Sequence, residues 1–513
     1  SVTKENAHPH VSMNGSVVLV HNGIIENYSE LKEILLKEGF VFNSQTDTEV
    51  IANLIEHNLK KEPNFLEAVR KSLLQLEGSY ALAILLKTIP GFILAKKEAP
   101  LVLGLTDSSE VFAASDPVAL LDFTRKLIFL NDFEMAYVSE QGVSISNIRT
   151  GQIILKKPET VSWSLEETQK GNFAHFMIKE IFDQPFAVKN ALRQDSALLE
   201  KAVHLIQKAK TVLFLGSGSS YHACLQGKYW FSEIAALKVD SVLASEFENQ
   251  SQFIDSSSVI VTASQSGETA DVLQAVKQAK EKGAKIISLC NSQGSTLVRL
   301  ADVNFPLNSG PELCVLATKT FMSELTLFLF LAFGLANRWN EGRNLLNLAG
   351  AEILKFLRNE NLVLLENLAK RTFGEKNYFV IGRNTMYPLA LESALKIKEV
   401  SYIHAEGFAG AELKHGTIAL IEKDTPVIAL AHPSNRKQLI SNALEVKARG
   451  AFVIGIDTQK SEAYDFWFEV PDLGPALPLL SIVPVQVLAY YLAVEKGLDP
   501  DKPRNLAKSV TVM

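Results

Sequence analysis

Residues 211–224, TVLFLGSGSSYHAC, decide the fold of this chain, because an apolar strand runs through a Gly/Ser turn directly into a helix. The same order returns in VIVTASQSGETADVLQAVKQAKEKG (259–283) and in KNYFVIGRNTMYPLALESALKIKEV (376–400). Strands that alternate with helices predict a parallel sheet covered on both faces. The repetition predicts two tandem α/β units, residues 190–345 and 346–500, built on a duplicated fold.

The chain before residue 190 has another pattern. Residues 1–155 combine short apolar strands with helices predicted near 29–38, 46–59 and 64–76, which indicates an α+β domain. One predicted strand is the long run IFLNDFEMAYV at 128–138. The charged stretch 156–189 is predicted to be a linker, and 501–513 a C-terminal tail. Because the sequence opens without a methionine and reaches VVLV almost at once, we expect a leading part of this domain to be missing.

Composition excludes several classes of protein. With 51 Lys+Arg, 57 Asp+Glu and a net charge of −6, the chain has no basic surface for nucleic acid. The longest apolar runs, 325–336 and 476–494, are respectively too short and too interrupted by prolines to cross a bilayer, so we expect buried core and no membrane partner. Cys224, Cys290 and Cys314 lack ligand spacing and indicate reduced thiols in the cytoplasm.

Neither a metal nor a cofactor is expected. His8, His10 and His21 have no carboxylate or cysteine at ligand spacing and are interpreted as structural.

Two Gly/Ser loops follow predicted strands and could bind a phosphate. Backbone amides at a helix start and serine hydroxyls donate hydrogen bonds to anions. A single such loop is more often a plain connection, but two at neighbouring strand ends favour a ligand site. The candidates are Gly218, Ser219, Ser220, Ser264, Gln265, Ser266 and Thr269.

The type of phosphate can be narrowed from the same loops. Neither contains the Gly-Lys-Ser/Thr of a triphosphate site. A dinucleotide, and with it an oxidoreductase, would need a third glycine where Tyr221 stands. A small monophosphate therefore fits best.

Several residues further along the chain suit acid–base or amine chemistry. Lys396 and Glu399 share a helix face with Glu392, an arrangement that suits acid–base chemistry. The alternative interpretation is that Glu392 and Lys396 form only an exposed ion pair. His415 is a loop histidine suited to opening a sugar ring, although such residues are often only exposed. Lys508 belongs to a tail that would otherwise be solvated.

In the N-terminal domain, Asn22 and Gly23 follow the strand VVLV. An asparagine side chain and a glycine amide at a strand end suit an oxyanion hole.

Six stretches together resemble the glutamine:fructose-6-phosphate amidotransferase family: NAHPH, HNGIIENY, QTDTEVIA, SQSGETAD, ALKIKEVSYIHAEGFAGAELKHG and PRNLAKSVTV. The resemblance implies an α+β glutaminase domain of the N-terminal-nucleophile type, followed by two flavodoxin-like α/β sugar isomerase (SIS) domains. It also implies the activity. Ammonia from glutamine would pass through an internal channel to fructose 6-phosphate, giving glucosamine 6-phosphate and glutamate.

The resemblance implies roles for the candidate residues. Asn22 and Gly23 would form the oxyanion hole, and Asp47 would bind the amino group of glutamine. The two Gly/Ser loops would hold the sugar phosphate. Lys508 would form the Schiff base, Glu399 would move the proton between C1 and C2 with help from Lys396, and His415 would open the ring from a neighbouring subunit of a homodimer. Arg383 and Arg504 match basic positions of the family to which no role is assigned.

The sequence departs from the family in three places. The nucleophilic cysteine expected at the start of the glutaminase domain has no counterpart, because all three cysteines lie in the isomerase half. We therefore expect the glutamine step to be disabled in this chain and sugar phosphate binding to be kept. Ala317 replaces a usual serine, and Ser217 a common cysteine.

The alternative function is a non-catalytic sugar-phosphate-binding regulator.

Overall fold

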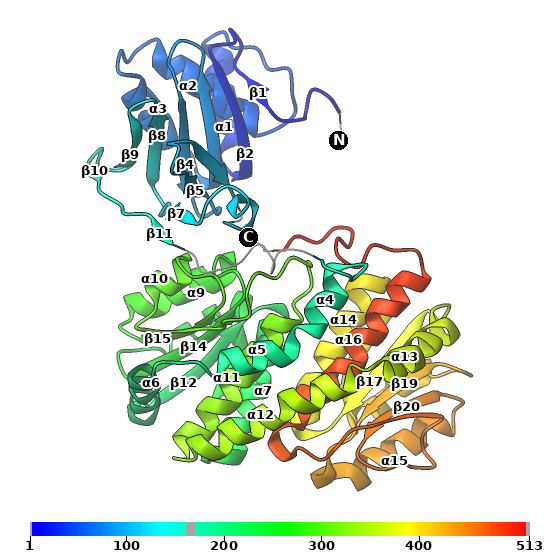
Figure 1. Cartoon of the computed structure of the whole chain (residues 1–513). Helices are drawn as coiled ribbons and strands as arrows, with labels where there is room; N and C mark the ends of the chain where they lie inside the picture. The colour runs from blue at the N-terminus through cyan, green and yellow to red at the C-terminus, as the bar shows by residue number, and fades with distance from the viewer. Residues whose placement is uncertain (1–2, 116, 161–169, 509–513) are drawn as a thin grey trace. The chain divides into compact units, whose positions relative to one another are not determined.

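The computed structural model describes residues 3–115, 117–160 and 170–508. The chain divides into two compact units, which are described separately: unit 1 runs to Thr168, and unit 2 covers nearly all of the remainder (Figure 1).

Unit 1 contains a seven-stranded antiparallel sheet with helices on one face and a second sheet on the other. Buried side chains of α2 and α3 pack on strands β2 to β4, and Leu94, Leu103 and Ile128 join the two sheets. The helices are α1 (Tyr28–Lys37), α2 (Thr48–Leu59) and α3 (Phe65–Leu73). The large sheet has the order β1 (His10–Val11), β2 (Val17–Ile25), β3 (Gly78–Leu86), β4 (Phe92–Lys97), β8 (Glu134–Ser139), β9 (Gly142–Asn147), β10 (Ile153–Ile154).

The second sheet of unit 1 has the order β11 (Glu159–Thr160), β7 (Lys126–Phe129), β5 (Val102–Leu105), β6 (Val111–Ala114). The prediction of one strand over 128–138 is wrong, because β7 and β8 belong to different sheets. The chain turns between them at Phe133, whose φ is +61°, and the Glu134 carboxylate accepts the Asn131 N–H at 2.7 Å.

Unit 2 contains two five-stranded parallel sheets with the same strand order. The first is β13 (Asp240–Leu243), β12 (Thr211–Gly216), β14 (Ser258–Ser264), β15 (Lys285–Cys290), β16 (Val303–Pro306). The second is β18 (His404–Ala409), β17 (Asn377–Gly382), β19 (Pro426–Leu430), β20 (Phe452–Asp457), β21 (Phe466–Glu469). In each sheet the first strand of the repeat lies between the second and the third. The predicted duplication of a flavodoxin-like fold is thereby confirmed.

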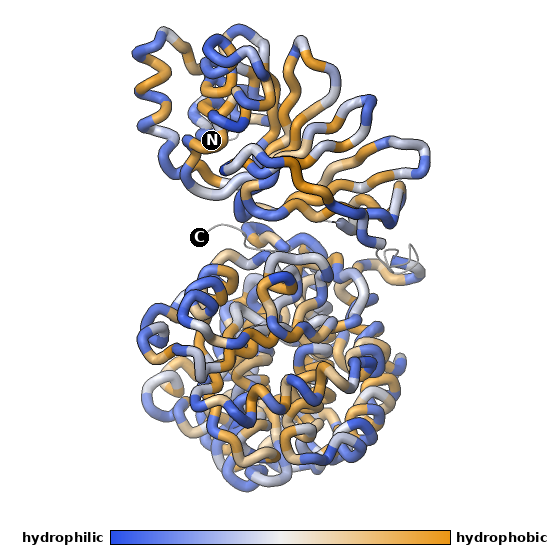
Figure 2. The backbone as a smooth tube through the Cα atoms, turned by 90° about the vertical axis from the view of Figure 1, so that its left-hand side faces the viewer, coloured by the Kyte–Doolittle hydropathy of each residue, from blue (hydrophilic) through white to orange (hydrophobic). Residues whose placement is uncertain are grey.

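The helices of unit 2 cover both sheets and link them. They are α4 (Phe176–Phe182), α5 (Gln184–Ala191), α6 (Ser196–Lys208), α7 (Gly218–Ala235), α8 (Glu248–Ser251), α9 (Ala270–Glu281), α10 (Thr296–Leu300), α11 (Lys319–Leu335), α12 (Trp339–Phe356), α13 (Asn359–Thr372), α14 (Tyr387–Ser401), α15 (Arg436–Lys447) and α16 (Leu477–Glu495). One apolar core contains α11, α16 and strands of both sheets. The two repeats therefore form one body, and apolar stretches run through its inside (Figure 2).

The two apolar runs singled out from the sequence are α11 and α16. Every residue of α11 is buried. The segment Gly474–Glu495 is long and apolar enough to cross a membrane by composition, but 89% of its most apolar window is buried inside unit 2. Both runs are core helices of this unit.

Two predicted boundaries differ from the structure. The predicted linker 156–189 contains α4 and most of α5, which belong to unit 2 because Met177, Ile181 and Val188 are buried in its core. The predicted boundary at 345/346 falls inside α12, whose buried face packs in the same core.

Candidate functional site

Two loops of the first repeat meet at one edge of its sheet. β12 ends at Gly216 and α7 begins at Gly218, while β14 ends at Ser264 and α9 begins at Ala270. The strands are parallel neighbours, with Leu215 opposite Thr262. Because carboxyl ends of parallel strands open on the same edge, the structure brings the predicted phosphate-binding loops together.

The first loop depends on its glycines. A Cβ on Gly216 would lie 2.8 Å from the backbone of Ser220, so the strand could not approach the helix this closely with any other residue. Gly218 has a φ of +54°, a left-handed conformation that glycine adopts without strain. Ser219 and Ser220 follow it in the first turn of α7.

The second loop shows one difference from the sequence interpretation. Ser264 is buried, and its hydroxyl oxygen accepts the Gly267 N–H at 2.9 Å, so this residue shapes the loop. Gly267 has a φ of +66° and lies against Ser295, where no Cβ fits. Gln265, Ser266 and Thr269 are half-buried and remain the ligand-facing candidates.

Lys396 lies at the centre of a buried cluster beside the first loop. Its Nζ is 2.7 Å from Glu399 Oε2 and 3.3 Å from Glu392 Oε1, and it donates to Ser219 Oγ at 3.0 Å. The alternative of an exposed ion pair is wrong, because the Lys396 and Glu392 side chains are at most 1% exposed. Burial by itself lowers the pKa of Lys396, but the two carboxylates outweigh it and the pKa lies above its ordinary value.

Glu392 connects α14 of the second repeat to α7 of the first. Its Oε2 is 2.8 Å from His222 Nδ1. Burial by itself raises the pKa of Glu392, yet Lys396 and His222 outweigh burial and hold that pKa below its usual range. The contact fixes the helix that carries Lys396 and Glu399 against the helix that begins at the phosphate loop.

Lys508 is held by a buried carboxylate. Its Nζ is 2.8 Å from Glu312 Oε2 and donates to the Cys314 carbonyl at 2.7 Å. Burial by itself raises the pKa of Glu312, but the charge of Lys508 and hydrogen bonds from Thr320 and Thr318 outweigh it, so the pKa is lowered. The interpretation of a solvated tail is therefore wrong for Lys508.

One loop contacts both lysines. Residues 312–318 provide Glu312 and the Cys314 carbonyl to Lys508, and the Ala317 carbonyl accepts from Lys396 Nζ at 3.4 Å. The two lysines are more than a hundred residues apart in the chain, and only the family resemblance, not the local pattern, linked them. The structure joins the amine of the tail, the lysine–carboxylate pair of α14 and the Ser219 hydroxyl through this loop.

Three other predicted residues lie elsewhere. His415, in the turn Glu412–His415, is exposed, and no hydrogen bond among the described residues joins its ring to the cluster. The Arg383 guanidinium donates to Asn442 Oδ1 at 3.1 Å. The Arg504 guanidinium stacks on the Tyr402 ring at 4.2 Å.

Sequence reasoning missed three buried acids of this site, Glu180, Glu312 and Glu324. Glu180, on α4, accepts the backbone N–H groups of Leu313 and Cys314, and burial with the nearby charge of Glu312 raises its pKa to about 8. The one available signal was a lone acid within an apolar helix, as Glu324 is in FMSELTLFLF. The thiols of Cys224 and Cys314 are poorly suited to this chemistry, because burial raises their pKa and favours the protonated form.

In unit 1 the predicted glutamine-binding residues come together. Asn22 and Gly23 lie inside β2, which continues to Ile25, rather than after its end. Asp47 directly precedes α2, and its Oδ2 accepts the Ile25 N–H at 2.8 Å. Gly23 has a φ of +141°, and a Cβ there would lie 2.2 Å from the Ser79 carbonyl oxygen. The carboxylate and the glycine are therefore held on the same stretch of β2.

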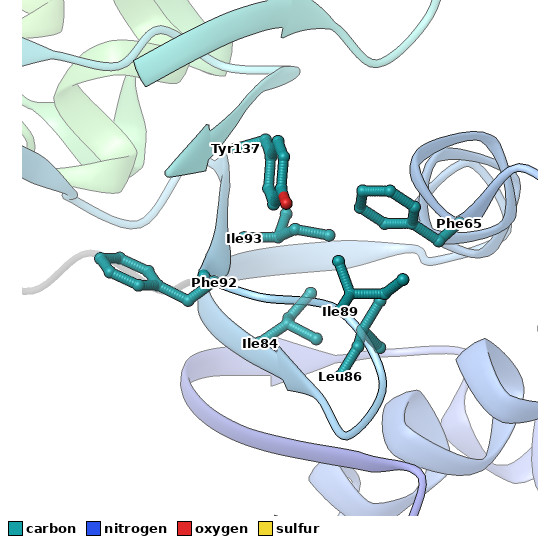
Figure 3. A pocket seen from close by; sticks show the side chains of 8 residues that line it. Phe65, Ile84, Leu86, Ile89, Phe92, Ile93 and Tyr137 are labelled. Atoms are coloured by element: carbon teal, nitrogen blue, oxygen red, sulfur yellow. The ribbon is translucent and has the colours of Figure 1, made fainter. Parts of the chain in front are cut away.

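A shallow apolar hollow in unit 1 lies at the other end of β3 from this stretch. Figure 3 shows Phe65, Ile84, Leu86 and Tyr137 around it. Ile84 pairs with Leu19, whereas Tyr80 pairs with Gly23. The Tyr137 hydroxyl donates to the Pro90 carbonyl, so the hollow offers little polar chemistry.

The fold and site define a class of protein: a glutamine amidotransferase domain joined to a duplicated sugar isomerase. Family models agree, since the "Glutamine amidotransferase domain" matches residues 2–122 and the "SIS domain" matches 205–334 and 373–496.

Relatives identify the family. The chain is 44% identical to glutamine--fructose-6-phosphate aminotransferase [isomerizing] of Thermococcus kodakarensis and 43% identical to that of Pyrococcus horikoshii, covering 99% of this chain and 86% of each relative. The chain belongs to this family of isomerising aminotransferases. Nothing in these comparisons favours the non-catalytic regulator.

Solved structures resemble unit 2. The C-terminal domain of glucosamine-fructose-6-phosphate aminotransferase from Francisella tularensis matches with a TM-score of 0.59 and 30% identity over 65% of this chain and all of that one. A glucosamine-6-phosphate deaminase from Thermotoga maritima matches with a TM-score of 0.52 and 25% identity, covering 65% of this chain and 99% of that one.

Proposed function

We propose that the chain acts on fructose 6-phosphate in unit 2, in the reaction of its family in which nitrogen from glutamine, bound in unit 1, gives glucosamine 6-phosphate. The nucleophilic cysteine of the glutamine step is not among the residues of this chain, so we expect this chain by itself to lack that step. Family membership supports the reaction, and the two loops at the edge of the first sheet support a phosphorylated sugar as substrate. No cofactor is needed for this chemistry, because an amine, a carboxylate and hydrogen-bond donors are sufficient.

The residues of unit 2 divide the work as follows. The phosphate lies on Gly218, Ser219, Ser220, Gln265, Ser266 and Thr269, with Ser264 shaping the second loop. The amine of Lys508 attacks the C2 carbonyl and water leaves, giving an imine. Ammonia from glutamine adds to C2 and the Lys508 amine leaves, so that the imine nitrogen now comes from glutamine. Glu399 then removes the C1 proton and returns it to C2. Lys396 orients Glu399 through their 2.7 Å contact and ties this pair to Ser219.

His415 opens the sugar ring in a second copy of the chain. Its exposure in its own chain supports this assignment, because an exposed imidazole is available to a neighbour. We therefore propose a homodimer. A net charge of −6 and the burial of α16 support a cytoplasmic enzyme with neither a nucleic acid nor a membrane as partner.

Unit 1 binds glutamine. Asn22 and the Gly23 amide stabilise the oxyanion that forms when the amide is attacked, and Asp47 binds the amino group. The Asp47–Ile25 hydrogen bond supports this assignment, because it holds the carboxylate beside the strand that carries the two other residues.

The observation that carries the proposal is the loop 312–318, which contacts both Lys508 and Lys396. The test is borohydride reduction of the chain in the presence of fructose 6-phosphate, followed by peptide mass spectrometry. We expect one reduced sugar adduct, on Lys508. The adduct should disappear in Lys508→Arg and remain in Lys502→Arg, an exposed lysine of the same tail. An adduct that survives Lys508→Arg would refute the assignment.

A further inference from the structure

Glu324 is a buried acid behind the phosphate loop to which the proposed chemistry gives no role. It lies on α11, where it is 1% exposed and surrounded by apolar residues of the core. Its Oε1 is 2.7 Å from Ser220 Oγ. Its Oε2 is fully buried and has no hydrogen-bond partner among the residues that the structure describes. A charged carboxylate with one oxygen unpaired in this position is costly.

The two carboxylates near Glu324 act in the same direction as its burial. Burial has the largest effect on the pKa of Glu324 and raises it, and the nearby Glu312 and Glu392 raise it further. A hydrogen bond from Ser220 and the charge of Lys396 lower it. The net result is a pKa of about 8. On α7, Cys224 also faces it.

The other helices against α11 bring little charge to this point. Ionisable side chains of α5 and α6 are exposed, and on α12 the half-buried Glu352 pairs with Lys355. At the far end of α16, Glu495 is only half-buried. Burial and the neighbouring carboxylates therefore favour the neutral form of Glu324 at pH 7.

The state of this carboxyl decides what Ser220 can offer a ligand. The Ser220 hydroxyl donates to Glu324 Oε1 in the structure. A neutral carboxyl can reverse this hydrogen bond and donate its own hydrogen to Ser220 Oγ, so that the hydroxyl hydrogen of Ser220 stays available to an anion. An ionised carboxylate can only accept, so it takes that hydrogen and Ser220 presents lone pairs to the loop. A dianionic phosphate is bound by the first arrangement and repelled by the second.

We propose that Glu324 is a positioning residue that, as a neutral acid, turns the Ser220 hydroxyl into a donor for the sugar phosphate and, when ionised, withdraws that donor. The inference rests on the proposed function, because it needs a phosphate on the loop of Ser220. It adds to that function a built-in loss of sugar phosphate affinity at alkaline pH.

The test measures the Kd of sorbitol 6-phosphate between pH 7 and pH 9 by calorimetry on the full chain. This probe lacks a carbonyl and cannot form an imine with Lys508, so its Kd reports the phosphate site. If only the neutral form binds, the wild-type Kd rises about 10-fold over this range. Glu324→Gln keeps a donor toward Ser220 at every pH, so its Kd should change by less than about 2-fold.

Two further variants serve as controls for this experiment. Glu233→Gln, at an exposed position of α7, should keep the wild-type rise in Kd. Ser220→Ala removes the donor that Glu324 controls, so it should bind more weakly than wild type at pH 7 with a flat profile. If Glu324→Gln does not fold, the Ser220→Ala variant still tests the proposal.

The two hypotheses fail differently. Parallel pH profiles for the wild type and Glu324→Gln, or a Ser220→Ala variant that keeps the 10-fold rise, would overturn the role of Glu324 and leave the phosphate site standing. No binding of sorbitol 6-phosphate to the wild type at pH 7 would overturn the proposed function itself.

Discussion

The two repeats of unit 2 share a backbone and differ in the side chains at their open edges. Gly216, Ser217 and Gly218 of the first correspond to Gly382, Arg383 and Asn384 of the second. Ser217 has φ −128° and ψ 147°, and Arg383 has φ −133° and ψ 146°. Gly218 and Asn384 are left-handed, with φ of +54° and +50°. In both repeats the leading glycine lies where a Cβ would collide with the following turn.

The second edge carries no row of hydroxyls. After β19 the chain reads HPSNR, where Ser434 is hydrogen-bonded to His432. At the end of β20, Asp457 is fully buried and accepts from the Arg436 guanidinium and the Tyr464 hydroxyl. The two repeats therefore have the same backbone turns but different functional side chains. In the proposed site, the first repeat provides the phosphate donors, and the second provides the helix with Lys396 and Glu399.

The largest effect should come from the catalytic helix of the second repeat. Glu399→Gln should lower the rate of fructose 6-phosphate isomerisation by about 10²–10⁴-fold, because an amide cannot accept the C1 proton. Binding of sorbitol 6-phosphate should change little, since the proposed phosphate site lies on the first repeat. Measuring both on one preparation checks the division between repeats. A comparable loss of binding would contradict it.

The buried carboxylate of the second edge should be structural. Asp457→Asn leaves Arg436 without its ion pair, and we expect a loss of about 2 kcal/mol in the free energy of unfolding, reduced from the value for a fully buried pair because Arg436 is partly exposed. Denaturant unfolding measures this loss, and Glu469→Gln, exposed on β21, should have no measurable effect. A variant that kept its stability but lost isomerisation would give Asp457 a role in the reaction.

Removing a hydroxyl should matter at only one edge. Ser266→Ala should weaken sorbitol 6-phosphate binding about 10-fold, the usual cost of one hydrogen bond to a charged group. Ser434→Ala, in the corresponding loop of the second repeat, should leave the Kd unchanged. Equal losses at the two positions would indicate a second phosphate site in the second repeat.

The smallest effect concerns the shared turn. Gly218→Ala has open space for its Cβ, so its cost should be the left-handed strain alone, about 1 kcal/mol of unfolding free energy. Asn384→Gly should change stability by only a few tenths of a kcal/mol, because asparagine already tolerates this conformation. Urea midpoints distinguish the two variants. A large loss in Asn384→Gly would mean that its side chain, and not the turn, stabilises this edge.

Much of the fold follows from local pattern. The alternation of apolar strand, loop and helix predicts both parallel sheets, because strands buried on both faces are nearly continuous apolar runs, as every residue of β14 shows. The same reasoning failed over 128–138. There the apolar run continues through a turn, and nothing in the local pattern separates one strand from two that belong to different sheets.

The candidate site likewise contains residues that the sequence predicts and residues that it does not. Spacing along one helix placed Lys396 and Glu399 on a common face, and glycine positions marked the first phosphate loop, since both signals are local. Glu312 and Glu324 could not be predicted, because their partners Lys508 and Ser220 are 196 and 104 residues away in the chain.

By itself, the sequence determined the alternation of strand and helix in two repeats, the loops that follow the strands and the lysine–carboxylate pair on one helix. Only the tertiary structure decided which acids are buried, which lysine each of them contacts, and which serine hydroxyl forms a hydrogen bond within its own loop. The physical reason is that burial and the charges of neighbours set the state of an ionisable group, and both are properties of the packed core rather than of the local chain.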